Sequence, residues 1–126
     1  MSTMRLTHLI PMLPVRSMSA SVEFYQKILG FSVEERNDKW GWAMLAFGEC
    51  RLMLDQSLNV DPDAPRQSIV YLYPDDVVQY HEHVKRNGLD APDLKVTFYD
   101  MLEFRTSDPD GNRLWIGQPQ PSTGNA

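Results

Sequence analysis

The sequence has few of the features that mark membrane, secreted or nucleic-acid-binding proteins. Its one cysteine, Cys50, can form no disulfide within the chain, and such sparing use of cysteine is typical of a reducing compartment, so we expect a cytoplasmic protein. No apolar run approaches the roughly 20 residues that cross a bilayer, and the amino-terminal segment lacks the apolar core of a signal peptide. Lysine and arginine form no cluster and the net charge is −5, which argues against a nucleic-acid partner.

The composition that is present predicts a single globular domain. The 126 residues are 42% apolar and 23% charged, which is the ordinary range for soluble domains. A chain of this length buries about two-thirds of its unfolded surface in one core. We therefore treat residues 1–126 as one domain with no membrane partner.

A helix with defined ends is predicted in the first half of the chain. Ser17 is of a residue type that caps helices, and Gly30 is of the type that ends them. Between the two, Val22, Tyr25 and Leu29 recur at helical spacing. An apolar strand, Leu6–Leu13, precedes this helix, and three short strands follow it at 31–36, 42–47 and 51–56.

The second half repeats this order after a polar, proline-rich connection at Ser57–Arg66. A strand is predicted at Ser68–Tyr73, followed by a helix that Asp75 caps and Gly88 closes. Three further strands are predicted near 95–98, 102–107 and 113–118. The chain is therefore a structural repeat of two similar halves.

Each half has the order βαβββ, so the predicted fold class is α+β, with two modules at about residues 5–56 and 67–118. The helix of a module covers one face of its sheet and leaves the other face free. Two such modules pair into a cup-shaped half-barrel, which is a natural ligand site. Exposed strand edges favour a homodimer, in which the modules pair within one chain or, swapped, between two chains.

The last two strands form a hairpin around a tight turn, Asp108-Pro109-Asp110-Gly111. Side chains alternate between the two faces of a strand, so Arg113, Trp115 and Gly117 share one side. A large indole on that side is unexpected for a simple hairpin, and it bears directly on what the cup can bind.

Two stretches of the sequence, LIPMLPVRSMSASVEFYQKILGF (9–31) and MLEFRTSDPDGNRLWIGQ (101–118), resemble the vicinal oxygen chelate superfamily. This superfamily includes glyoxalase I, fosfomycin resistance enzymes, extradiol dioxygenases and bleomycin resistance proteins. Metal-dependent members carry ligands on the first strand of each half and a carboxylate on the last strand. The equivalent positions here are Ile10, Ser68 and Trp115, which cannot replace a His, His, Glu set, so the resemblance implies no metal and no cofactor.

The three histidines are the remaining candidates for metal ligands. His8 would serve if the register of the first strand slid by two residues, but one imidazole does not hold a catalytic metal. His81 and His83 lie two apart on a helix and point in nearly opposite directions. We interpret all three as solvated or capping residues.

Within the superfamily, the metal-free bleomycin resistance proteins are the most similar group. The similarity lies in the first strand, Ile10–Leu13, and in the Glu-Phe pair that precedes the Asp-Pro-x-Gly turn. It implies a homodimer that sequesters a planar or cationic small molecule in an aromatic-lined cleft without breaking a bond. Trp115 would then offer a flat apolar surface where other relatives have a carboxylate.

Strand alternation predicts which residues line the cup. We place the positions equivalent to the metal ligands, Ile10, Ser68 and Trp115, on the inner face of the cup. The same alternation then predicts four further inward side chains: His8, Met12, Val70 and Arg51. Aromatic and methionine side chains suit a planar ligand, and Glu103 and Arg105 either hold charged groups of that ligand or neutralise each other. The predicted ligand-binding residues are Trp40, Trp42, Met44, Met53, Ser68, Tyr99, Met101, Glu103, Arg105 and Trp115.

Two other functions remain open at this point. An enzyme is one: a metal-dependent lyase, isomerase or dioxygenase, or a metal-free isomerase in which Glu103 is the base and burial raises its pKa. The other is a protein-interaction module in which the cup is filled with side chains. The bleomycin analogy alone does not identify the ligand.

Overall fold

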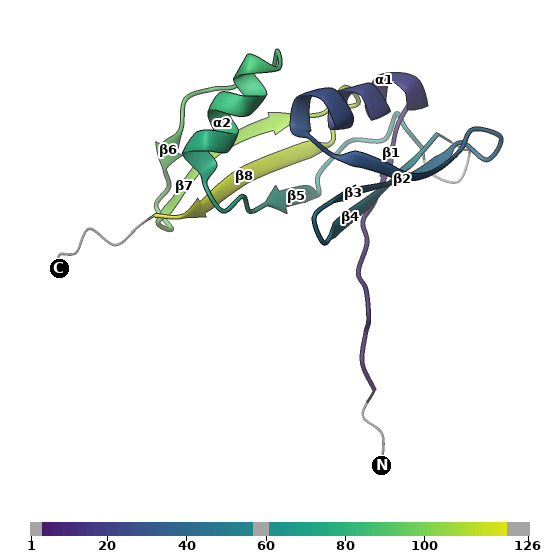
Figure 1. The fold of residues 1–126 in the computed structure, drawn as a ribbon, viewed down its shortest axis with the longest axis horizontal. Coiled ribbons are helices and arrows are strands. Elements are labelled where there is room, and N and C mark those ends of the chain that lie inside the picture. Colours follow the sequence, from purple (N-terminus) through teal and green to yellow (C-terminus); the bar gives the residue numbers. More distant parts are fainter. Residues whose placement is uncertain (1–3, 57–60, 121–126) are drawn as a thin grey trace.

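The computed structural model describes residues 4–56 and 61–120, which form two four-stranded sheets with the helices on one side of them (Figure 1). Part of the connection expected at Ser57–Arg66 therefore lies outside the described residues. The first sheet has the strand order β1-β4-β3-β2, and the second has the order β5-β8-β7-β6. No helix in the described part of the chain is long and apolar enough to span a membrane.

The elements follow the predicted repeat. The first half contains β1 (Met12–Pro14), α1 (Met18–Glu23), η1 (Phe24–Leu29), β2 (Ser32–Asn37), β3 (Trp42–Phe47) and β4 (Cys50–Asp55). The second half contains β5 (Ile69–Leu72), α2 (Val77–Arg86), β6 (Lys95–Val96), β7 (Met101–Ser107) and β8 (Arg113–Pro119). In each half the first strand runs parallel to the last, and the other neighbours are antiparallel. The α+β class and the βαβββ order are confirmed.

The first helix begins and ends where the sequence predicts, but its second half is a π-helix. The Ser17 side chain accepts a hydrogen bond from the Ala20 backbone N–H at 3.2 Å. Gly30 ends the element in the left-handed conformation, with φ at 95°, which favours glycine. The wider turn over Phe24–Leu29 was not predicted. Within this π-helix, Tyr25 and Leu29 are fully buried in the core.

The second helix differs from the prediction by one residue at its start. Asp76, not Asp75, is the N-cap, and its carboxylate accepts a hydrogen bond from the Gln79 N–H at 3.0 Å. Val77 and Val84 are fully buried on the face that α2 turns toward the second sheet. Their partners in the core come from the covered face of β7 and β8, namely Phe104, Leu114 and Ile116.

The first strand is shorter than predicted and starts later. Residues 4–11, which include most of the expected strand Leu6–Leu13, run as an extended arm away from the sheets (Figure 1). Pro11 and Pro14 lack the N–H donors that a longer ladder needs, which limits β1 to three residues. The arm leaves Leu6 and Leu9 at 92% and 85% exposure.

The turn between β7 and β8 joins the two halves of the chain. It has the predicted form, with the Gly111 N–H donating to the Asp108 carbonyl at 3.0 Å. The Tyr25 hydroxyl on η1 donates to the buried Asp108 carboxylate at 2.8 Å. Burial and the nearby carboxylate raise the pKa of Tyr25, so this hydroxyl stays protonated and donates. Ser21 on α1 donates in the same way to Asp110 at 3.1 Å.

Candidate functional site

The free face of the second sheet carries a cluster of polar and aromatic side chains. On β7, Glu103 and Arg105 lie on this face, and cross-strand pairing places Gly117 opposite the first and Trp115 opposite the second. Tyr71 of β5 pairs with Trp115 from the other side. We call Tyr71, Tyr99, Glu103, Arg105 and Trp115 the Glu103 cluster.

The Glu103 carboxylate is the centre of this cluster. Its side chain is only 3% exposed, and one oxygen accepts hydrogen bonds from the hydroxyls of Tyr71 at 2.6 Å and Tyr99 at 2.8 Å. The other oxygen accepts from Arg105 Nε at 2.7 Å. Burial alone would raise the pKa of Glu103, but the hydrogen bonds outweigh it and lower the pKa below its ordinary value. Glu103 is therefore a fixed negative charge at neutral pH.

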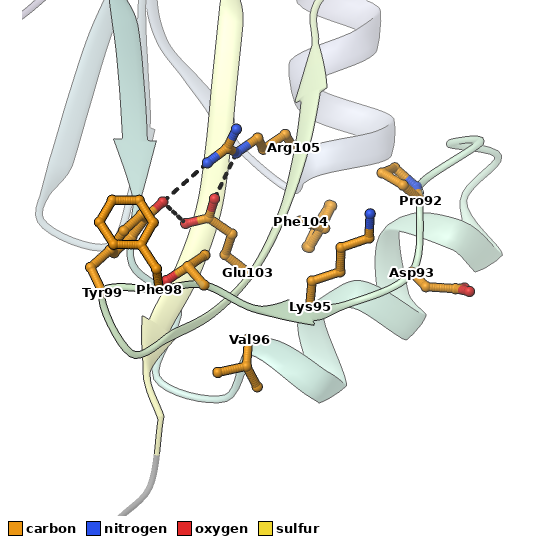
Figure 2. Close-up of a pocket in the computed structure, with 10 residues that line it drawn as sticks. Pro92, Asp93, Lys95, Val96, Phe98, Tyr99, Glu103, Phe104 and Arg105 are labelled. Atoms are coloured by element: carbon orange, nitrogen blue, oxygen red, sulfur yellow. Dashed lines mark hydrogen bonds and ion pairs between the residues drawn. The ribbon is translucent and has the colours of Figure 1, made fainter.

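Arg105 lies over the indole of Trp115, with its Cζ 3.4 Å from the ring centroid. Its Nη2 donates to the Tyr99 hydroxyl at 3.2 Å (Figure 2). The guanidinium is therefore held by three partners: Glu103, Tyr99 and Trp115. The hydrogen bonds to Glu103 and Tyr99 raise the pKa of Arg105 further, so it is charged throughout the accessible pH range. The structure pairs Glu103 and Arg105 with each other, and whether either group also holds a charged group of a ligand stays a prediction.

Gly117 leaves the space that the cluster needs. A Cβ atom at this position would lie 2.7 Å from both the Glu103 Cβ and the Tyr71 hydroxyl oxygen, and 2.9 Å from the Leu102 carbonyl oxygen. These distances are shorter than any normal contact of a methyl group. The absence of a side chain at Gly117 is therefore a condition for the buried position of Glu103.

A hollow of about 320 Å³ opens beside the cluster, where β6 ends and the edge of β7 becomes free (Figure 2). Glu103, Arg105 and Tyr99 form one part of its wall, and Lys95 and Phe98 form another. Phe98 is 99% exposed, which is unusual for a phenylalanine. The hollow thus combines charged groups with uncovered aromatic surface.

The free face of the first sheet carries a second, separate group of predicted residues. Met44 and Met53 are cross-strand partners on this face, and the Trp42 indole Nε1 lies 3.1 Å from the Met53 sulfur. All three side chains are partly exposed. None of these three residues lines the hollow beside Glu103.

The prediction for β5 is wrong by one residue. Val70 pairs with Leu114 and lies on the face that α2 covers, so it does not turn inward with Trp115. Tyr71 occupies the inward position, and sequence reasoning missed it. Ser68, which shares the parity of Val70, precedes β5 and is exposed. The alternation of Tyr71 and Tyr73 before Pro74 was the signal that could have set the register correctly.

The remaining predicted residues lie outside the Glu103 cluster. Trp40 is in the turn between β2 and β3 and is 68% exposed. Met101 starts β7 on the same face as Glu103 but does not line the hollow. Ser68 lines a second hollow of about 180 Å³ between the halves, together with Met12 and Arg113. Their part in ligand binding stays a prediction.

The donor atoms of this site do not fit a divalent metal ion. Trp115 offers no lone pair, and a guanidinium cation covers its ring. Both oxygens of Glu103 are already engaged by donors. His8 lies on the exposed arm, and its ring nitrogen contacts Thr7. Among the residues that the structure describes, no three His, Cys, Asp or Glu side chains form a group that could hold a metal.

The alternative in which Glu103 is a general base required that burial raise its pKa, and this expectation is wrong. Its pKa is lowered, because Tyr71, Arg105 and Tyr99 all donate to the charged form. No oxygen of this carboxylate faces the hollow without a donor already bound to it. Proton abstraction by Glu103 would require the cluster to come apart.

Acidification is expected to remove the stabilisation that Glu103 provides. Its pKa in the folded chain is lowered below that in the unfolded chain, so its contribution is present above the unfolded pKa and is lost as the pH falls through the folded pKa. Glu103→Gln lacks this titration, so the difference in unfolding free energy between wild type and variant should shrink from neutral pH to about pH 3. Urea unfolding at a series of pH values measures it. A difference that stayed constant or grew would contradict the assigned charge.

Comparison with solved structures shows the same fold in antibiotic-binding proteins. A bleomycin-binding protein solved with bleomycin is 24% identical, with a TM-score of 0.76, over 91% of this chain and 100% of that one. A bleomycin resistance determinant encoded on the transposon Tn5 is 23% identical, with a TM-score of 0.77, over 92% and 100%. An antibiotic binding protein from Streptomyces sp. CB03234 is 24% identical, with a TM-score of 0.76, over 94% and 100%.

The family of the chain follows from a match to its sequence. No protein of curated function matches it at a significant level. A family description, the glyoxalase/bleomycin resistance protein/dioxygenase superfamily, matches residues 5–116, which is nearly the whole chain. The βαβββ repeat and the turn at Asp108–Gly111 agree with it, and the resemblance stated from the sequence is confirmed. The chain belongs to the glyoxalase/bleomycin resistance protein/dioxygenase superfamily.

Proposed function

We propose that this protein binds a small planar molecule on the free faces of its sheets and holds it without transforming it. The observation that carries the proposal is the Glu103 cluster, whose fixed ion pair and Tyr99 ring border an open hollow together with the exposed ring of Phe98. The rings provide flat contact surface for a ligand, and the ion pair provides hydrogen-bonding groups. The antibiotic-binding proteins that share the fold make a drug-like ligand a reasonable expectation.

Sequestration is favoured over chemistry because the charged groups of the site are already satisfied. Glu103 is ionised and accepts three hydrogen bonds, and Arg105 is held by Glu103 and Trp115. A general base needs a free lone pair close to the proton that it removes. Recovery of an added ligand as a different compound, after incubation with pure protein, would overturn this part of the proposal.

We further propose that the binding unit is a homodimer in which a second copy covers the free face of the first sheet. Trp42, Met44 and Met53 give that face an apolar surface that is only partly buried. The arm at residues 4–11 extends away from the body and exposes Leu6 and Leu9, which supports an exchange of arms between copies (Figure 1). The same proposal places the dimer in the cytoplasm, in keeping with its one cysteine.

Charges on the arm are expected to break the dimer. In the double variant Leu6→Asp/Leu9→Asp, two carboxylates would have to be buried in the contact between copies, which costs several kcal/mol. Light scattering after size-exclusion chromatography should then report a monomer for the variant and a dimer for the wild type. Val78→Asp is the matched control, since Val78 is 49% exposed in the first turn of α2. A monomeric wild type would refute the proposal.

The binding proposal itself is tested by titrating the protein with planar compounds and following tryptophan fluorescence. A ligand on the free faces should quench the signal, and the Trp115→Phe variant should lose part of this change. The ligand should be recovered chemically unchanged. Planar compounds that leave both the fluorescence and the melting temperature unaltered would count against a binding function.

A further inference from the structure

We propose that the ligand of this site is a planar aromatic molecule that carries a carboxylate, and that Arg105 binds that carboxylate. This inference rests on the proposed function and names the class of ligand. Of the planar or cationic ligand that the resemblance implied, it keeps the planar part and departs from the cationic part, because the structure places a cation, Arg105, over the Trp115 ring. A cationic ligand would first have to displace this guanidinium from both Trp115 and Glu103.

The guanidinium of Arg105 is positioned to accept an anion without rearrangement. The guanidinium has five N–H donors, and within the described chain Nε donates to Glu103 and one N–H of Nη2 donates to Tyr99. The Nη1 amino group has no partner among the described residues, and the side chain is 49% exposed. A guanidinium edge held in one plane matches the two oxygens of a carboxylate, and holding it in advance lowers the cost of binding.

Lys95 adds a second positive group to the same hollow. It pairs with Glu103 across β6 and β7 and therefore lies on the same face of the sheet. Within the described residues Lys95 makes no ion pair, whereas the charge of Glu103 is compensated by Arg105. Asp93 also borders the hollow, but its carboxylate points away from Glu103 and Arg105 (Figure 2). Of these two side chains, Lys95 adds a positive group to the wall of the hollow, and Asp93 adds a negative one that is turned away from Arg105.

The rings beside these cations explain why an aromatic acid suits the site better than a simple anion. Phe98 and Tyr99 border the hollow next to Arg105, with their ring centroids 5.0 Å apart in an edge-to-face contact. Phe98 is almost completely exposed, so a flat ligand would remove a large apolar surface from water. Such a ligand places its ring on Phe98 and its carboxylate on the Nη1 edge of Arg105.

A series of three naphthalene compounds of equal size tests this assignment. Naphthoate is the anion, naphthamide is the neutral analogue, and naphthylmethylammonium is the cation. Isothermal titration calorimetry on the wild-type protein should give a dissociation constant at least about tenfold lower for naphthoate than for naphthamide, a difference of about 1.4 kcal/mol. The cation should bind more weakly than the neutral compound.

Two arginine variants complete the experiment. Arg105→Gln should weaken naphthoate about tenfold or more and leave naphthamide nearly unchanged. Arg36→Gln is the matched control, because Arg36 also pairs with a carboxylate two residues away, Asp38 at 2.7 Å, but on the first sheet. It should leave naphthoate affinity unchanged. If Arg105→Gln does not fold, the charge series on the wild type decides the question alone.

The outcomes distinguish a failure of this inference from a failure of the function on which it rests. Tighter binding of the cation, equal binding of all three compounds, or an unchanged naphthoate affinity in Arg105→Gln would overturn the anion assignment and leave the binding function standing. No binding of any of the three compounds would contradict both.

Discussion

Replacing Asp108 by alanine is expected to lower the free energy of unfolding by about 3–5 kcal/mol, because buried donors would lose their acceptor. The Asp108 carboxylate accepts from the Tyr25 hydroxyl at 2.8 Å and from Asn112 Nδ2 at 2.8 Å. It also accepts from the backbone N–H groups of Asp110 and Asn112, both at 2.9 Å, which shape the turn. Chemical unfolding of wild type and variant measures the loss.

Two further variants show whether the link between halves is responsible for this effect. Tyr25→Phe removes one of the donors and should cost about 1–2 kcal/mol. Asp90→Ala changes an exposed aspartate with no role in the turn and should stay within about 0.5 kcal/mol of wild type. A loss below about 1 kcal/mol for Asp108→Ala would show that the turn does not join the two halves as described.

Replacing Gly117 by alanine is expected to dismantle the Glu103 cluster and to destabilise the chain by about 2–4 kcal/mol. The added methyl group would lie 2.7 Å from the Tyr71 hydroxyl oxygen and from the Glu103 Cβ, so at least one of these side chains must move. Displacing Glu103 also removes the partner that holds Arg105 over Trp115. We therefore expect ligand affinity and stability to fall together.

A second substitution in the same background identifies the clash. Tyr71→Phe in the Gly117→Ala protein removes the hydroxyl oxygen from the crowded space and should restore part of the lost stability. The same Tyr71→Phe change in the wild type removes a hydrogen bond to Glu103 and should destabilise by about 1 kcal/mol. Additive effects of the two substitutions, with no restoration, would contradict the close contact at Gly117.

The fold could be predicted from the sequence because its signals are local. Ser17 and Gly30 mark the ends of the first helix, and the Asp-Pro-Asp-Gly turn marks the last hairpin. The register of β5 was less secure, because a strand of four residues with apolar side chains on both faces offers no clear alternation. An error of one residue in this strand led to the prediction that Val70 faces inward, whereas Tyr71 does.

The site was predicted only in part for a similar reason. Glu103, Arg105 and Trp115 share a face by simple alternation on two paired strands, so the sequence places them together. The way they are joined depends on Tyr71 and Tyr99, which approach from a different strand and from a loop. The sign of the pKa shift of Glu103 follows from those donors and not from burial. Contacts between distant segments of this kind leave no pattern in the sequence.

The central claim is that a planar ligand is held, unchanged, against the free face of the second sheet. The most direct test is nitrogen-labelled NMR of the wild-type protein titrated with naphthoate, with the indole N–H signals of the three tryptophans assigned by Trp→Phe variants. We expect saturable shifts of the Trp115 indole N–H and the Arg105 Nε–H signals, with naphthoate recovered intact. Saturation with neither signal shifted, or conversion of naphthoate to another compound, would contradict it.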